Sequence, residues 1–283
     1  MIDVIMCSYN SEDTIAEAVE SVLNQTFEKF NLYVFDDNSQ DKTLDILKKY
    51  THDKRLTIIS SKNNIGTYAA KNYVLKNLCK SPYVALHDSD DYSEPTRFEK
   101  QFNHLQSSYA ACVGTAVREF WKEGEEPHTV SESEIKNNER TNLYPRNLSR
   151  EHLKMILPTL IDENKYEQYL KFKFCMNGTI MVRKYVLQEL GGWDGKTRIA
   201  ADTDLFIRIL SKYQIDNLEE NLYNRRFHKK SLTSSSSTGI DSDVRKKYNL
   251  KRKQVVVDSL NKTPTKMDFH YPEFECEIIK CVE

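Results

Sequence analysis

Three aspartates, Asp88, Asp90 and Asp91, directly follow the apolar segment 83–86 in this chain of 283 residues. An apolar run that ends in carboxylates is typical of a buried strand that delivers acids to the edge of a sheet. Asp88 and Asp90 are two residues apart, so on an extended backbone their side chains leave on the same face. Carboxylate oxygens are hard ligands that suit Mg²⁺ or Mn²⁺. The spacing indicates a metal or ribose-phosphate site, although an isolated pair of this kind is more often a solvated turn.

Two further polar clusters strengthen that interpretation because each also follows an apolar run. Ser8-Tyr9-Asn10 follows residues 2–7, and Asp36-Asp37 follows residues 32–35. In parallel sheets the carboxyl ends of the strands meet at one edge, where ligands bind. We therefore expect all three clusters to line a single crevice.

The elements that must position these clusters alternate between strand and helix. Apolar runs at 2–7, 32–35, 56–59 and 83–86 alternate with helical patterns near 15–23, 44–47 and 68–78, and Ser11 is the expected N-cap of the first helix. Such alternation implies right-handed crossovers. The predicted fold class is α/β, with a mixed, mostly parallel central sheet flanked by helices.

The remaining chain is divided by composition. We expect a helix after Pro95, strands at 111–114 and 176–182, and helices at 184–190 and about 202–212. The polar stretch 121–150 indicates a long excursion or lid. The serine run 234–237 indicates a linker or loop, and the apolar residues near 255–260 indicate a helix. The predicted organisation is therefore residues 1–110 and 111–233 as two halves of one domain, followed by a helical extension over 234–283.

Composition limits the partners. With 41 basic and 42 acidic residues, the formal net charge is -1, which provides no global field to recruit nucleic acid. No apolar run reaches the roughly 20 residues that a membrane-spanning helix needs. The six cysteines form no Cys-x-x-Cys pair, so neither structural zinc nor a disulfide framework is expected. The cytosol is the expected compartment.

The chain carries a series of short motifs. In order, they are Ser8-Tyr9-Asn10, Ser21-Val22-Leu23-Asn24-Gln25-Thr26, Asp36-Asp37-Asn38-Ser39, Asn64 with Gly66, Ala70-Lys71-Asn72, Asp88-Ser89-Asp90-Asp91, Gly191-Gly192-Trp193-Asp194, Asp202 with Asp204 and Arg208, and Arg226 with His228. In this order and spacing, the motifs resemble those of the family 2 glycosyltransferases, which are inverting enzymes with the GT-A (Rossmann-like) fold, and the resemblance covers roughly residues 2–233.

The resemblance implies a nucleotide-sugar donor, with UDP the expected nucleotide. It implies that Asp36 or Asp37 accepts a hydrogen bond from the N–H of the nucleotide base, and that Asp88 lies near the ribose. It also implies Mn²⁺ or Mg²⁺ on Asp90, with His228 as a further metal or phosphate ligand. The other expected nucleotide-sugar contacts are Ser8, Tyr9, Asn10, Asn64, Lys71, Ser89 and Trp193. Lys71 stands where many relatives have arginine, which keeps the charge but loses the bidentate fork.

The resemblance also implies a catalytic base at the start of a helix. The family supplies a Glu-Asp pair, whereas this chain has Ala201 before Asp202. One carboxylate suffices to take the proton of the acceptor hydroxyl, so Asp202 is the predicted base and Asp204 the alternative. Three of these residues also allow a purely structural role. Asp202 fits a simple helix N-cap, His228 fits part of a solvated loop, and Trp193 fits plain core packing.

The predicted function is transfer of a sugar to a hydroxyl of a saccharide or lipid-linked acceptor in surface polysaccharide or oligosaccharide biosynthesis, with peripheral membrane association possible. The lack of a Gln-x-x-Arg-Trp motif favours single additions. Two other functions stay open: a sugar nucleotidyltransferase, which would need a glycine-rich basic loop after the first strand, and a catalytically idle nucleotide-sugar-binding module. The sequence does not identify the donor sugar, the acceptor, the linkage or the oligomeric state.

Overall fold

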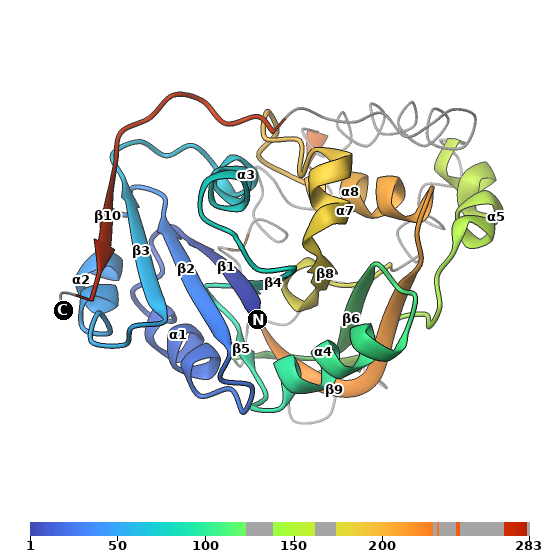
Figure 1. Cartoon of the computed structure of the whole chain (residues 1–283), viewed down its shortest axis with the longest axis horizontal. Helices are drawn as coiled ribbons and strands as arrows, with labels where there is room; N and C mark the ends of the chain where they lie inside the picture. Colours follow the sequence, from blue (N-terminus) through green and yellow to red (C-terminus); the bar gives the residue numbers. More distant parts are fainter. Residues whose placement is uncertain (123–137, 162–173, 229–230, 232–241, 244–268, 282–283) are drawn as a thin grey trace.

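The computed structural model describes residues 1–122, 138–161, 174–228, 231, 242–243 and 269–281 (Figure 1). In this part of the chain ten strands form one sheet in the order β10-β3-β2-β1-β4-β8-β6-β9-β5, with β7 beside β6. The strands are β1 (Ile2–Ser8), β2 (Phe30–Asp36), β3 (Leu56–Ser61), β4 (Tyr83–Asp88), β5 (Tyr92–Ser93), β6 (Cys112–Trp121), β7 (Glu139–Asn142), β8 (Met181–Arg183), β9 (Ile215–Phe227) and β10 (Cys276–Lys280).

The direction of pairing differs between the two halves of the sheet. Strands β3, β2, β1 and β4 are parallel, as expected for strands joined by helical crossovers. Strand β8 pairs antiparallel with β4 and with β6, and β6 pairs parallel with β9. The predicted mixed α/β sheet is confirmed, with its parallel pairs concentrated in the first half.

Helices cover both faces of this sheet (Figure 1). They are α1 (Ile15–Leu23), α2 (Thr43–Lys48), α3 (Thr67–Asn77), α4 (Arg97–Ser107), α5 (Arg150–Ile161), α7 (Lys184–Leu190) and α8 (Ala201–Leu210), together with the short 3₁₀ turn η3 (Asn177–Thr179). Along β1, Val4 packs in the cluster that contains α1 and α4, whereas Ile5 packs in the cluster that contains α3, α7 and α8. Successive residues of a strand point to opposite faces, so both faces are buried.

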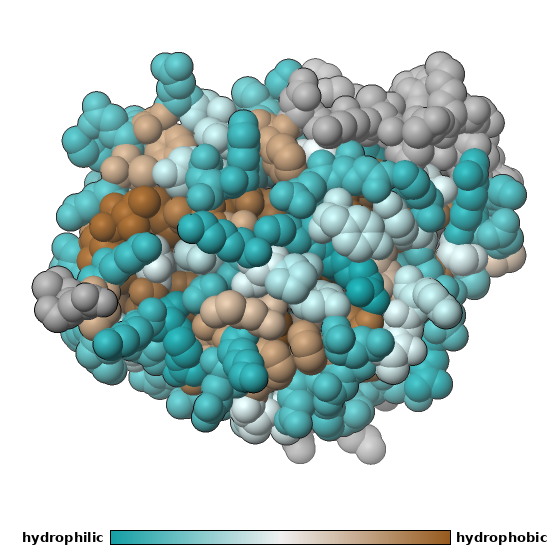
Figure 2. Space-filling view, viewed as in Figure 1, coloured by the Kyte–Doolittle hydropathy of each residue, from teal (hydrophilic) through white to brown (hydrophobic). Residues whose placement is uncertain are grey.

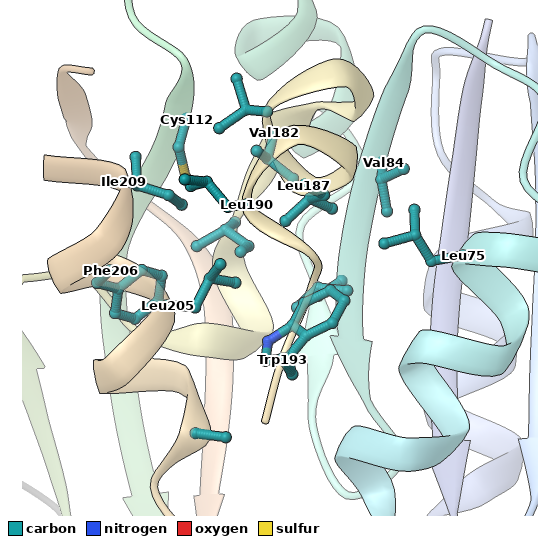
Figure 3. Packing of buried hydrophobic residues seen from close by; sticks show 14 of the residues in the cluster. Leu75, Val84, Cys112, Val182, Leu187, Leu190, Trp193, Leu205, Phe206 and Ile209 are labelled. Atoms are coloured by element: carbon teal, nitrogen blue, oxygen red, sulfur yellow. The ribbon is translucent and has the colours of Figure 1, made fainter. Parts of the chain in front are cut away.

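The larger of the two clusters joins the halves of the sheet. Figure 3 shows Trp193 between Leu75 and Val84 on one side and Leu187, Leu190 and Leu205 on the other. Trp193 is fully buried within this cluster. An aromatic side chain of this size contributes strongly to packing, so it holds α3 and β4 against α7 and α8.

Local differences from the expected elements have identifiable causes. The first helix begins at Ile15, and the Ser11 carbonyl accepts from the N–H groups of Thr14 and Ile15 while its hydroxyl pairs with Ser89. The Ser11 side chain is thus not the N-cap, and that prediction was wrong. The expected strand 176–182 is shortened to β8 because residues 177–179 form η3.

The ends of the predicted lid and the C-terminal extension contribute strands. Strand β7, after the undescribed residues 123–137, pairs with β6, and β10 adds antiparallel to β3. Strand β10 was not predicted, because its five residues Cys-Glu-Ile-Ile-Lys give little periodic signal. The expected helix near 255–260 and the serine loop 234–237 lie outside the described residues.

The described surface in Figure 2 is mostly hydrophilic, with more hydrophobic residues toward the β10 side of the sheet. Ile278 of β10 is among the exposed large hydrophobic side chains. No helix in the described ranges is both long and apolar enough to cross a membrane.

Asn72 provides a test of how the two halves are joined. Its side chain accepts from the Trp193 N–H at 3.0 Å and donates to the carbonyls of Trp193 at 2.8 Å and His270 at 3.1 Å. Asn72→Ala removes all three bonds in a buried place, so we expect the free energy of unfolding to fall by at least about 2 kcal/mol. Urea denaturation measures this, with Asn77→Ala on the exposed end of α3 as the control. Equal stability of both variants would show that Asn72 does not hold the halves together.

Candidate active site

The three polar clusters meet at one edge of the sheet, as predicted. Ser8 pairs with Asp36 across β1 and β2, and Cys7 pairs with Asp88 across β1 and β4. The parallel direction of these strands brings their carboxyl ends together. The edge therefore gathers the side chains that the sequence singled out.

The loop after β1 is tied to the loop after β2. Asn10 has a left-handed backbone, with φ of 50°, which asparagine tolerates better than most residues. Its N–H donates to Ser39 Oγ at 2.9 Å and its Oδ1 accepts from the Gln40 N–H at 2.8 Å. Tyr9 between the strand and this turn is 51% exposed. Tyr9 is thus available to a ligand, whereas Asn10 fixes the loops.

Asp36 and Asp37 are both buried but have different partners. Asp36 accepts from the N–H and hydroxyl of Ser39. The Asp37 oxygens accept from the N–H groups of Ile65 at 2.7 Å and Gly66 at 2.8 Å. Burial raises the pKa of both carboxyls, and the hydrogen bonds oppose that rise. Asp37 therefore shapes the loop before α3. The oxygens of either carboxyl keep lone pairs that can accept a hydrogen bond from the N–H of a nucleotide base.

Asn64 lies in that loop between two partners. Its amide nitrogen donates to the Asp37 carbonyl at 3.2 Å, and its Oδ1 accepts from Arg198. Arg198 also donates to the Asn64 carbonyl at 2.9 Å. Gly66 has φ of 91°, and a Cβ there would lie 2.8 Å from Arg198 Cδ. The loop is thus clamped to the segment that leads into α8.

Lys71 and Asp88 form an ion pair at this edge of the sheet. Lys71 Nζ lies 3.9 Å from Asp88 Oδ1 and 5.7 Å from the centre of the Tyr68 ring, and Lys71 is almost fully buried. The Asp88 side chain is 33% exposed. Removal of water from its carboxyl by the surrounding protein raises the pKa of Asp88, and the charge of the Lys71 ammonium opposes this rise. A cation that approached Asp88 would favour its ionised form further.

Asp90 and His228 come together although 138 residues separate them. His228 Nε2 lies 2.9 Å from Asp90 Oδ2, and both side chains are partly exposed. Asp91 beside them is buried and accepts from the Arg226 N–H at 2.8 Å. Burial, followed by the charges of Asp90 and Asp88, raises the pKa of Asp91 well above its ordinary value. Asp91 therefore serves the structure of the turn, and Asp90 with His228 faces solvent.

The pair Asp90 and His228 fits a divalent cation. Among the described residues, no three His, Cys, Asp or Glu side chains already surround a metal position. Mg²⁺ is usually bound through one or two carboxylates and completes its shell with water and substrate phosphates. Asp90 is one such partly exposed carboxylate, and the imidazole of His228 lies beside it. Ser89 is mostly buried and bonds Ser11 Oγ, so it holds this turn against the loop after β1.

Asp202 lies in the first turn of α8. Its Oδ1 accepts from the Thr203 N–H at 2.9 Å and from the Tyr68 hydroxyl at 3.4 Å. Tyr68 also lies against Lys71, so these three residues and Asp88 form one continuous group.

Asp204, the alternative base, has a structural partner. Its Oδ2 accepts from Arg208 Nε at 2.9 Å and Nη2 at 2.7 Å, and both side chains are buried. Arg208 also donates to the carbonyls of Leu190 and Gly192, both at 2.8 Å. This pair attaches α8 to the turn after α7. The geometry leaves Asp202, rather than Asp204, available to a substrate.

Trp193 differs in position from the other predicted binding residues. It has no exposed surface, and its ring packs in the core shown in Figure 3. Its contact with a donor stays a prediction, whereas the core packing that the sequence also allowed is what the structure shows. The two preceding glycines have left-handed backbones, which permit the tight turn.

Two important residues near Asp88 were not predicted. A Cβ on Gly178 would lie 2.4 Å from the Tyr223 hydroxyl and 2.5 Å from Asp88 Oδ2. The Tyr223 hydroxyl accepts from the Asp88 N–H at 3.1 Å. The Asn-Gly pair after the apolar residues 174–176 was the only sequence signal for Gly178. Tyr223 carried none, because its position depends on the pairing of β9 with β6.

Comparisons with known proteins identify the family of the chain. The model of glycosyl transferase family 2 matches residues 3–191. The chain is 30% identical to the putative glycosyltransferase EpsE of Bacillus subtilis, covering 84% of this chain and 79% of that protein. It is 31% identical to the O-antigen biosynthesis glycosyltransferase WbnJ of Escherichia coli, covering 83% of each.

A shorter match links the chain to a protein with a named reaction. It is 36% identical over 107 residues to the UDP-Glc:alpha-D-GlcNAc-diphosphoundecaprenol beta-1,3-glucosyltransferase WfaP of Escherichia coli, covering 38% of this chain and 42% of that protein. Among solved structures, S. aureus TarS 1–349 with UDP-GlcNAc superposes with a TM-score of 0.59 at 18% identity, covering 91% of this chain and 72% of that one. The fold is thus that of the GT-A protein TarS.

The roles of Asp202 and Asp204 can be separated by stability. Asp204→Ala leaves the buried Arg208 guanidinium without its carboxylate, so the free energy of unfolding should fall by about 3 kcal/mol. Asp202→Ala removes a partly exposed carboxylate and should change it by less than about 1 kcal/mol. Thermal unfolding of both variants measures the difference. A large loss for Asp202→Ala would mean that this residue is part of the framework.

Proposed function

Because this chain belongs to glycosyl transferase family 2, we propose that it moves a sugar from a UDP-sugar to a hydroxyl of a saccharide or lipid-linked saccharide, with inversion. The observation that carries the proposal is the continuous group of Asp88, Lys71, Tyr68 and Asp202. This group links a donor-side carboxylate to a candidate base through Lys71 and Tyr68, which supports the proposal. The O-antigen role of WbnJ supports a place in surface polysaccharide assembly.

The donor is bound by the first half of the sheet. Asp36 or Asp37 accepts the N–H of the base, Ser8 and Tyr9 border it, and Asn10 and Asn64 hold the surrounding loops. Lys71, nearly buried beside Asp88, presents a positive charge to the diphosphate. The solved complexes of TarS with UDP and with UDP-GlcNAc support UDP as the nucleotide.

In this proposal Asp90 and His228 would hold Mn²⁺ or Mg²⁺, which would neutralise charge on the departing diphosphate. The protein contributes the carboxylate and the imidazole at 2.9 Å, and β9 carries His228 to the end of β4. Ser89 and the buried Asp91 keep the turn between them in place.

Asp202 acts as the base. The acceptor oxygen attacks the anomeric carbon as the bond from that carbon to the diphosphate oxygen breaks, and the hydroxyl proton passes to an Asp202 oxygen. In-line displacement inverts the anomeric configuration. The Tyr68 hydroxyl, 3.4 Å from Asp202 Oδ1, orients the carboxylate toward the crevice.

A catalytically idle nucleotide-sugar-binding module would share the donor half of this site. It would bind UDP with metal but show no transfer, so the following two experiments separate it from an enzyme. A donor screen over UDP-, GDP- and dTDP-sugars identifies the substrate for both.

Asp202→Asn tests the base. The variant keeps the volume of the side chain but cannot take the proton, so kcat should fall by roughly 10²- to 10⁴-fold. The affinity for UDP with Mn²⁺, measured by calorimetry, should stay within about twofold because no nucleotide contact is removed. Retention of full kcat in Asp202→Asn would exclude this residue as the base.

Metal removal tests Asp90 and His228. EDTA should abolish transfer, Mn²⁺ or Mg²⁺ should restore it, and Asp90→Ala should lower kcat by orders of magnitude, at about tenfold per 1.4 kcal/mol of lost stabilisation. His228→Ala should raise the Mn²⁺ concentration needed for half-maximal activity. Asp45→Ala, on the exposed side of α2, is the matched control. Undiminished transfer in EDTA would overturn the metal assignment.

A further inference from the structure

The end of β4 extends beyond its pairing with β8. Among the described strands, β1 pairs with one side of β4 as far as Asp88, whereas β8 pairs with the other side only at residues 83–85. Buried backbone N–H and C=O groups need hydrogen-bond partners. On the β8 side, the last residues of β4 must therefore be bonded by other parts of the chain. These residues lead directly into the turn that carries Asp88 and Asp90.

Groups from three other segments provide those bonds. The Leu86 N–H donates to the Ile180 carbonyl at 2.9 Å, and the Leu86 carbonyl accepts from Arg97 Nη2 at 2.8 Å. The Asp88 N–H donates to the Tyr223 hydroxyl at 3.1 Å. The side chains of Arg97 and Tyr223 thus take the place of a neighbouring strand where the pairing with β8 stops.

Arg97 and Tyr223 are also packed against each other. Both side chains are fully buried, and Arg97 Cζ lies 4.9 Å from the centre of the Tyr223 ring, which is a favourable cation–π distance. Arg97 also donates to the Gly178 carbonyl at 2.9 Å, and Gly178 leaves no room for a Cβ beside the Tyr223 hydroxyl. The ring and the hydroxyl of Tyr223 are therefore both confined, and the hydroxyl is held at the Asp88 N–H.

We propose that Tyr223 is a positioning residue, whose hydroxyl sets the place of the turn that carries Asp88 and Asp90. The inference rests on the proposed function, and in it Tyr223 touches no substrate but acts through the Asp88 peptide. Strand β9 then supports the turn at two points, with Tyr223 at Asp88 and His228 at Asp90. A misplacement of about 1 Å at a reacting site can cost on the order of a hundredfold in rate. Loss of this one buried hydroxyl should therefore weaken the binding of the donor diphosphate with its metal.

Tyr223→Phe tests the proposal, with Tyr33→Phe as the matched control. Each variant loses one hydroxyl and keeps the ring, and the Tyr33 hydroxyl donates to the Leu78 carbonyl at 3.2 Å, between β2 and the end of α3. Both variants should have a lower Tm, because each loses a hydrogen bond. Only Tyr223→Phe should bind UDP with Mn²⁺ about tenfold more weakly in calorimetry, with at least as large a fall in kcat/KM for the donor. A lower Tm with unchanged affinity and unchanged kcat/KM in Tyr223→Phe would overturn the proposal.

A double substitution shows whether Tyr223 acts through Asp88. In an Asp88→Asn background, Tyr223→Phe should cause no further loss of affinity for UDP with Mn²⁺, because two changes that act on one group are not additive. Losses that multiply would show that Tyr223 acts elsewhere, and would overturn the proposal. If wild type binds UDP with Mn²⁺ but transfers no sugar, the proposed function fails, and the binding comparison still decides the role of Tyr223.

Discussion

The close approach of Gly178 to Asp88 is the constraint on which the rest of the site depends. A side chain at position 178 would overlap both the Asp88 carboxylate and the Tyr223 hydroxyl. The segment before β8 can therefore lie directly against the end of β4, and the antiparallel pair β4–β8 brings the second half of the sheet to the first. Glycine at this position lets these two backbones meet beside Asp88.

Buried polar side chains fix the geometry that this contact permits. Asn72 bonds the turn at Trp193 to α3, and Arg208 bonds the same turn to α8. On the surface, Arg198 bonds the loop at Asn64 to the segment before α8. Hydrogen bonds are directional, so they specify one relative placement where apolar packing alone would allow several. These hydrogen bonds hold α3, which carries Lys71, and α8, which carries Asp202, to the same neighbouring segments.

The parallel half of the fold and the meeting of the polar clusters could be predicted because both follow from local patterns. Apolar runs identified β1 to β4, and the parallel arrangement then placed Ser8, Asp36 and Asp88 together. Tyr223, Gly178 and β10 could not be predicted, since their positions depend on pairings between distant segments. The pairing of Asp204 with Arg208 is an i,i+4 contact within α8 that the sequence spacing indicates, whereas the bonds from Arg208 to the carbonyls of Leu190 and Gly192 depend on tertiary packing. The sequence pattern places residues at an edge of the sheet, and only packing decides which of them face the crevice.

Strand β10 has a consequence for the behaviour of the chain in solution. Without it, β3 would be an edge strand with Ile58 and Ile59 and a row of unpaired backbone groups, which is a template for pairing between molecules. Strand β10 occupies that edge and replaces it with an outer strand that carries Glu277 and Lys280. At the opposite end, β5 is only two residues long. Strand β10 thus covers the backbone groups of β3 and becomes the edge of the sheet itself, with charged residues beside the exposed Ile278.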